Sequence, residues 1–263
     1  MFGMVPDAPL IVAANRDERF DRPAVPITVL RERRPRILGG RDELAGGTWL
    51  AVNEYGVVAG LTNQPSFAGR DPAKRSRGEL PLAFASWASA ADAVEKVSAA
   101  LDPASYNPCW MLVGDREALF FIGVAGFGRP EVEQLDPGLH VLENSALRPR
   151  SAKAAFVTEL VTEALAQQDA EAAGAVAALE TVLRDHRPAI TEPLTDSAGR
   201  VRPPELTAAC VHGEGYGTRS AMTVSAPAAG LPSVRVADGR PCEHDLRDVT
   251  GLWTEQPPAR LAG

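Results

Sequence analysis

The sequence predicts one α+β domain whose sheets are mostly antiparallel. Apolar, β-branched runs occur in pairs joined by short polar turns, as in β-hairpins. Longer Ala- and Leu-rich segments have apolar residues spaced by three and four, as in helices. Strand and helix patterns come in blocks with few β-α-β units, which favours antiparallel pairing. We expect residues 1–263 to form a single domain.

Composition excludes several classes of function. The net charge is −7 and the pI about 5.2, so a strongly basic, nucleic-acid-binding surface is not expected, although local basic patches stay open. No apolar run is long enough to span a membrane, and residues 1–9 do not resemble a secretory signal. Three cysteines cannot form a disulfide framework, which predicts a cytoplasmic protein.

The first elements are strands. Residues 9–14 form a continuous apolar run that predicts a buried strand, and residues 15–19 follow it with a dense group of charges. Prolines between residues 23 and 35 predict irregular or edge structure. Residues 46–53 and 57–63 are joined by a short turn and predict a β-hairpin.

A helical region follows. Ser76 and Glu79 have the spacing of a capping box, so the helix begins there or at Pro81. The pattern continues to about Leu101 and is interrupted near Ser89. Because proline fits the first turn of a helix best, both starting points stay open.

The rest of the chain alternates again. Residues 109–114 and 118–122 predict a second hairpin, and residues 139–142 a short strand. Residues 151–185 predict one long helix or two, broken around residues 168–174, and the proline-rich residues 187–206 predict a loop. Further strands are expected at residues 207–212, 219–225, 234–237 and 249–254.

Two Cys-x-His pairs, Cys210 with His212 and Cys242 with His244, raise the question of a metal site. Residues two apart on a strand share a face, so four such ligands could surround a zinc ion. The spacing differs from the usual zinc motifs, and the second pair follows a proline. Buried or incidental thiols explain the cysteines more simply, and no metal is expected.

Polar residues at strand ends are the candidate site. Asn15, Arg16 and Asp17 follow a buried strand; they either bring acid, base and amide groups to one point or form an ordinary solvated strand end. Asn63 and Asn144 also end apolar runs, as turn formers or as donors to an oxyanion. Such alternatives cannot be separated by residue type alone.

Arg219 offers a similar choice. It follows a glycine-rich segment and begins a predicted strand. It is either a surface arginine or a bidentate clamp for a carboxylate or phosphate group.

Several of these segments together resemble a known family. The matching motifs are residues 13–18 (AANRDE), 46–50 (GGTWL), 61–63 (LTN), 77–80 (RGEL), 143–146 (ENSA) and 215–219 (GYGTR). Their order resembles that of the NRDE family, also called the transport and Golgi organisation protein 2 family, over residues 8–225. The resemblance implies a four-layer αββα sandwich of two mostly antiparallel sheets, as in N-terminal-nucleophile hydrolases.

The resemblance implies two functions, each with a small-molecule substrate or ligand. One is hydrolysis of an amide or thioester bond, without a cofactor, by an amino-terminal cysteine whose own amine acts as the base. In that case Asp17 orients the amine, the Asn side chains form an oxyanion hole and the Arg supports the site. By motif position these roles fall to Asn15, Arg16, Asp17, Asn63, Asn144 and Arg219. The alternative is non-enzymatic binding of haem, acyl-CoA or lipid, with haem as the cofactor.

The beginning of the chain departs from the family pattern. It reads Met1-Phe2-Gly3, without the expected cysteine, so the chain as given is expected to be inactive. Either the start is assigned too late and a leading strand is cut off, or the pocket persists without its chemistry. We favour the first, because Asp17 would have little reason to persist in an empty site. A sheet edge near the missing strand could also pair with a second copy, giving a homodimer.

Overall fold

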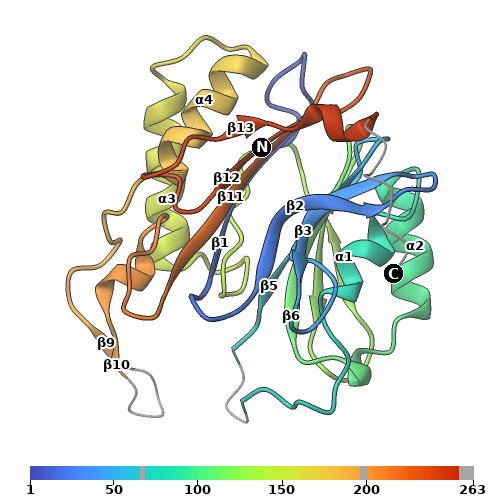
Figure 1. Ribbon diagram of the computed structural model, residues 1–263, viewed down its shortest axis with the longest axis horizontal. Coiled ribbons are helices and arrows are strands. Elements are labelled where there is room, and N and C mark those ends of the chain that lie inside the picture. The colour runs from blue at the N-terminus through green and yellow to red at the C-terminus, as the bar shows by residue number, and fades with distance from the viewer. Residues whose placement is uncertain (66–68, 196–200, 255–263) are drawn as a thin grey trace, which may run out of the picture.

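The computed structural model describes residues 1–65, 69–195 and 201–254. Its elements form four layers: two helices, a four-stranded sheet, a seven-stranded sheet and two further helices (Figure 1). Every paired strand is antiparallel. The predicted α+β class and αββα layering are therefore confirmed.

The smaller sheet has the order β1 (Leu10–Arg19), β11 (Tyr216–Ala226), β12 (Ser233–Asp238), β13 (Arg247–Asp248). The larger sheet runs in chain order: β2 (Ala24–Arg31), β3 (Ile37–Asp42), β4 (Leu50–Asn53), β5 (Val58–Asn63), β6 (Cys109–Gly114), β7 (Leu119–Val124), β8 (Glu131–Gln134). The helices are α1 (Glu79–Phe84), α2 (Ala90–Ala100), α3 (Ala152–Leu165) and α4 (Ala172–Leu183). Shorter elements are the hairpin β9 (Leu194–Thr195) and β10 (Val201–Arg202) and the 3₁₀ turns Pro103–Ser105, Pro204–Thr207 and Thr250–Trp253.

Successive side chains on each strand point to opposite faces of its sheet, so each sheet contributes to two hydrophobic cores. On β1, Leu10 and Val12 face the core between the two sheets, whereas Ile11 faces the core beneath α3 and α4. On β6, Leu112 faces the inter-sheet core and Met111 the core beneath α1 and α2. Both sheets are thus covered on both faces, which explains why several strands read as continuous apolar runs.

Most predicted elements are present. Both hairpins form as β4–β5 and β6–β7, and the long helix is split into α3 and α4 near residues 166–171. The proline-rich segment before β3 contains β2, which lies at the edge of its sheet, as expected of a strand with a proline. None of the described helices is long and apolar enough to cross a membrane.

Four expectations were wrong. Residues 139–142 form no strand, residues 207–212 begin in a 3₁₀ turn, and residues 249–254 form another. The capping box does not form: α1 begins at Glu79, and the Ser76 hydroxyl instead donates to the carbonyl oxygen of Gly46 at 3.2 Å. These signals were short, and tertiary contacts outweighed them.

An irregularity in β11 lies beside the candidate site. Arg16 pairs with Ser220 and Asp17 with Thr218, so Arg219 is an extra residue on β11. Within the described residues, β1 pairs on its other side only near its start, where Phe2 bridges Leu10 and Met1 exchanges hydrogen bonds with Ile11. The remainder of β1 is therefore an open sheet edge.

Candidate functional site

Asp17 lies near the end of β1 on the side of α3. Its Oδ1 accepts a hydrogen bond of 2.6 Å from the Thr218 hydroxyl, and its Oδ2 lies 3.8 Å from Lys153 Nζ. The carboxyl side chain is only 20% exposed. Burial raises the pKa of Asp17, and the Lys153 charge and the Thr218 hydrogen bond offset part of that rise. Asp17 is thus a largely buried carboxyl group whose position is fixed by its contacts with Thr218 and Lys153.

The contacts of Asp17 extend to neighbouring segments. Thr218 Oγ1 also accepts a hydrogen bond of 2.8 Å from the Val211 backbone N–H. The Tyr216 hydroxyl donates to the backbone carbonyl of Asp17 at 3.3 Å, and burial, with the nearby Asp17 charge, raises the pKa of Tyr216 to about 12. Sequence reasoning missed Lys153, Tyr216 and Thr218. The available signal was the motif at residues 215–219, which antiparallel pairing brings opposite Asp17.

Asn15 faces the same side of the sheet but has a different role. Its side-chain amide donates to the carbonyl oxygens of Leu183 at 2.9 Å and Ala209 at 2.8 Å. Both amide protons are therefore engaged with backbone. Asn15 ties β1 to the end of α4 and to the segment that precedes β11.

Arg16 faces the other side, between the two sheets. Its guanidinium lies 4.4 Å from the ring centroid of Trp49, and Nη2 is 3.8 Å from a Glu18 carboxylate oxygen. Burial lowers the pKa of Arg16. The buried Nη2 has no hydrogen-bond partner within the described residues, and Arg16 lines a small cavity of about 30 Å³ with Ser220 and Asp238. This guanidinium can accept an anionic partner.

Arg219, the extra residue on β11, holds the turn between β1 and β2. Its Nη1 donates to three backbone carbonyls, those of Arg19, Phe20 and Arg22, at 2.9, 2.9 and 3.0 Å. The guanidinium thereby supports the chain just beyond Asp17.

Asn63 and Asn144 are both exposed, at the ends of adjoining segments. Thr62 Oγ1 donates to the backbone carbonyl of Glu143 at 2.9 Å, which joins the end of β5 to the loop that contains Asn144. No hydrogen bond between either amide and Asp17 occurs in the described part of the chain. The structure brings the two asparagine segments together but not onto the Asp17 carboxylate.

A larger cavity of about 150 Å³ opens beside β5 and the loop before β6. Gln64, Arg77, Asn107 and Pro108 are among the residues that line it. Arg77 donates to the carbonyl of Pro108 at 3.1 Å, and burial lowers the pKa of its guanidinium. A buried arginine, Arg16, and a half-buried one, Arg77, thus border cavities in this protein.

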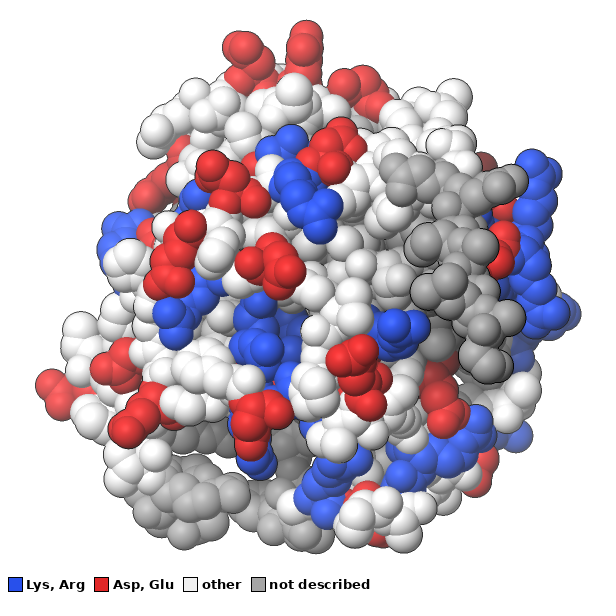
Figure 2. Space-filling view, in the orientation of Figure 1, with Lys and Arg blue, Asp and Glu red and all other residues white. Residues whose placement is uncertain are grey.

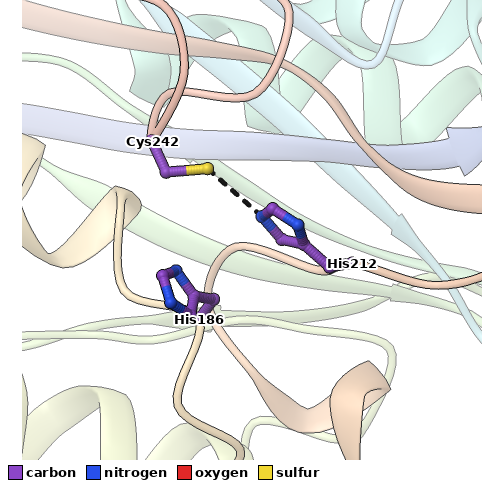
Figure 3. Close-up of side chains that lie close together, drawn as sticks. All are labelled: His186, His212 and Cys242. Atoms are coloured by element: carbon purple, nitrogen blue, oxygen red, sulfur yellow. Dashed lines mark hydrogen bonds between the residues drawn. The ribbon is translucent and has the colours of Figure 1, made fainter.

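The two Cys-x-His pairs are not arranged as considered from the sequence. Cys210, His212 and Cys242 come together, but the His244 ring lies against Gly239. Instead, His186 lies near His212 and Cys242, and Figure 3 shows these three side chains. His186 follows α4, and no local spacing in the sequence links it to the cysteines.

These features define an αββα protein with a buried aspartate at the end of an edge strand. The Transport and Golgi organisation 2 family profile matches residues 2–232, and the chain belongs to that family. The Transport and Golgi organization protein 2 homologs of Bos taurus and Homo sapiens are 32% and 31% identical over 237 residues. Each alignment covers 84% of this chain and 83% of the relative.

Among solved structures, two variants of conjugated bile acid hydrolase from Clostridium perfringens align with TM-scores of 0.48 and 0.47. Their sequence identities are 12% and 10%, and each alignment covers 94% of this chain and 91% of that chain.

Proposed function

We propose that the Asp17 site supports hydrolysis of an amide or thioester bond in a small molecule when an amino-terminal cysteine lies beside it. The observation that carries this proposal is the buried, Thr218-bonded Asp17 at the end of an open sheet edge. A carboxylate in that position can hold an α-amine, and the amine can take the proton of its own thiol. No cofactor is needed for this reaction.

The register of β1 says where such a cysteine belongs. The Met1 amino group donates to the carbonyl of Ile11 at 2.8 Å, and Phe2 pairs with Leu10. Because the segment at Met1 is antiparallel to β1, each residue placed before Met1 would lie opposite a residue further along β1. A residue about six positions before Met1 would therefore lie beside Asp17. That position is the one to test.

The test is a chain extended by a strand that begins Met-Cys, with the cysteine at that position. After removal of the initiator Met, we expect selective alkylation of the new cysteine and turnover of an acyl-amide or acyl-thioester substrate. The same extended chain with Asp17→Asn should lose turnover and keep its fold. The proposal is excluded if the extended chain shows neither selective alkylation of the new cysteine nor turnover of any substrate in a broad panel.

A second candidate is non-catalytic binding of an acyl-CoA, and the observation that favours it is that buried Arg16 and half-buried Arg77 each line a cavity. Arg16 Nη2 is without a hydrogen-bond partner among the described residues, and Arg77 borders the larger cavity. Guanidinium groups recognise phosphate and carboxylate oxygens. The same non-catalytic candidate includes haem as a second ligand, which would then be the cofactor of the protein.

A thermal-shift measurement with an acyl-CoA tests the first of these two ligands. We expect stabilisation that is reduced in Arg16→Gln and Arg77→Gln but kept in Arg41→Gln, which alters an exposed arginine. Haem would instead be detected by a Soret shift on titration. The absence of both effects would remove this candidate. The three free cysteines support a cytoplasmic location for either function.

A further inference from the structure

Two thiols and two imidazoles from three separate segments converge on one side of the smaller sheet. Cys210 and His212 precede β11, Cys242 lies in the turn after β12, and His186 follows α4. In Figure 3 the Cys242 and His212 side chains point toward each other, and the His186 ring lies beside them. Neither the proposed hydrolysis nor the arginine cavities use any of these four residues.

Three of the ligand atoms already have the spacing of a tetrahedral metal site. The Cys210 and Cys242 sulfurs are 3.7 Å apart, and His212 Nε2 lies 3.7 Å from Cys210 Sγ and 3.2 Å from Cys242 Sγ. Zinc bonds of ~2.3 Å to sulfur and ~2.0 Å to nitrogen separate two tetrahedral sulfurs by about 3.8 Å and a sulfur from a nitrogen by about 3.5 Å. A single ion displaced to one side of the plane of these three atoms fits these distances.

His186 offers the fourth ligand. Its ligand nitrogen and those of His212 and Cys242 all lie within 4.8 Å of one another. The two imidazole rings have centroids 5.4 Å apart and are tilted by 56°, so they are not stacked face to face. Because His186 is exposed, its side chain is free to turn toward Cys210, which lies outside that group of three, and so complete the tetrahedron.

Ordinary thiol packing explains this cluster less well. Two neutral thiols in contact need no imidazole beside them, and a disulfide requires a sulfur–sulfur distance near 2.05 Å, whereas the two sulfurs are 3.7 Å apart. Two soft thiolates and two imidazoles are the donor set of structural zinc sites. We propose that Cys210, Cys242, His212 and His186 bind one structural zinc ion.

The ion would join segments that backbone hydrogen bonds already bring near each other. The Cys210 N–H donates to the carbonyl of Asp185 at 2.8 Å, which is next to His186 in the chain. Val211, between the two ligands Cys210 and His212, donates to the Thr218 hydroxyl that binds Asp17. Zinc therefore fixes the segment on which the partner of Asp17 depends.

The test is cobalt and zinc titration of the full chain, reduced and stripped of metal. We expect one equivalent of Co²⁺ to produce visible ligand-field bands and a near-ultraviolet thiolate charge-transfer band, and Zn²⁺ to displace it and raise the Tm. Cys242→Ser, at a half-buried position, should lose the charge-transfer intensity of one thiolate and bind zinc at least about tenfold more weakly, since even outer-shell partners contribute that much.

Two variants separate this site from incidental binding. His186→Gln should weaken zinc binding at least about tenfold while keeping the charge-transfer band. His244→Gln, the control taken from the second Cys-x-His pair, should bind as the parent does. The proposal is overturned if the reduced chain gives no thiolate band, if Cys242→Ser leaves that band unchanged, or if His244→Gln weakens binding as much as His186→Gln.

Discussion

Neighbouring polar residues on β1 occupy different surroundings because side chains alternate along a strand. Asn15 and Asp17 face the helices, where one binds backbone carbonyls and the other a hydroxyl and an ammonium group. Arg16 faces the inter-sheet core against Trp49. Sequence reasoning identified this group as a whole but could not separate its members, because the partners come from residues far along the chain.

Asp17 should make the stability of the protein depend on pH. Burial raises its pKa above the ordinary 3.8, so the folded state holds this proton more tightly than the unfolded state. The contribution of Asp17 is then most favourable below pH 3.8 and is lost as the pH rises through its folded-state pKa. Asp17→Asn removes this dependence, so the free energy of unfolding of the parent should fall relative to the variant as pH rises.

Urea unfolding between about pH 4 and about pH 7 measures this difference. Asp21→Asn serves as the control, because that carboxylate is 65% exposed and pairs with Arg19 at the surface. A parent that gained stability relative to Asp17→Asn as pH rose would contradict the prediction.

At the scale of elements, local signals predicted the hairpins and the break between α3 and α4. They missed β3, because its Gly39 and Gly40 provide no apolar pattern. The Trp49 ring lies where a Cβ on Gly40 would be, 2.0 Å from Cζ2, so the glycine is required by packing from the next strand. His186 was missed for a similar reason: only the fold brings it to the cysteines.

The two serines near α1 and α2 give a test of helix capping. Ser89 precedes α2, and its hydroxyl accepts from the Asp92 N–H at 3.1 Å, whereas Ser76 caps no helix. Ser89→Ala should lower the free energy of unfolding by ~1 kcal/mol. Ser76→Ala, at a half-buried position whose hydroxyl donates to Gly46 and caps no helix, should cost less than Ser89→Ala. Chemical denaturation of both variants checks this, and equal losses would contradict it.

At the scale of the molecule, the two sheets share one core and each has a second core beneath its helices. Acidic and basic side chains are interspersed over the face shown in Figure 2, in keeping with the modest net charge. The cores predict that residues 1–263 behave as a single domain. Far- and near-ultraviolet circular dichroism should then report coincident unfolding transitions.

Phe84 tests that cooperativity. It is the last residue of α1 and is fully buried in the core between the helices and the larger sheet, so Phe84→Ala should cost ~3–5 kcal/mol and shift the whole transition. Phe127 is 74% exposed, and Phe127→Ala should stay within about 0.5 kcal/mol. A Phe84→Ala transition split into two steps would show that the layers unfold separately.

The three carbonyls bound by Arg219 affect how mutagenesis of this family should be interpreted. Removing that guanidinium frees the carbonyls of Arg19, Phe20 and Arg22 together, and with them the turn that leads from β1 into the larger sheet. Because Arg219 also lines the small cavity beside Arg16, a loss of function on replacing Arg219 would combine a loosened turn with any lost ligand contact. Arg16 lines the same cavity and its Nη2 has no hydrogen-bond partner among the described residues, so it is the better position at which to measure ligand recognition.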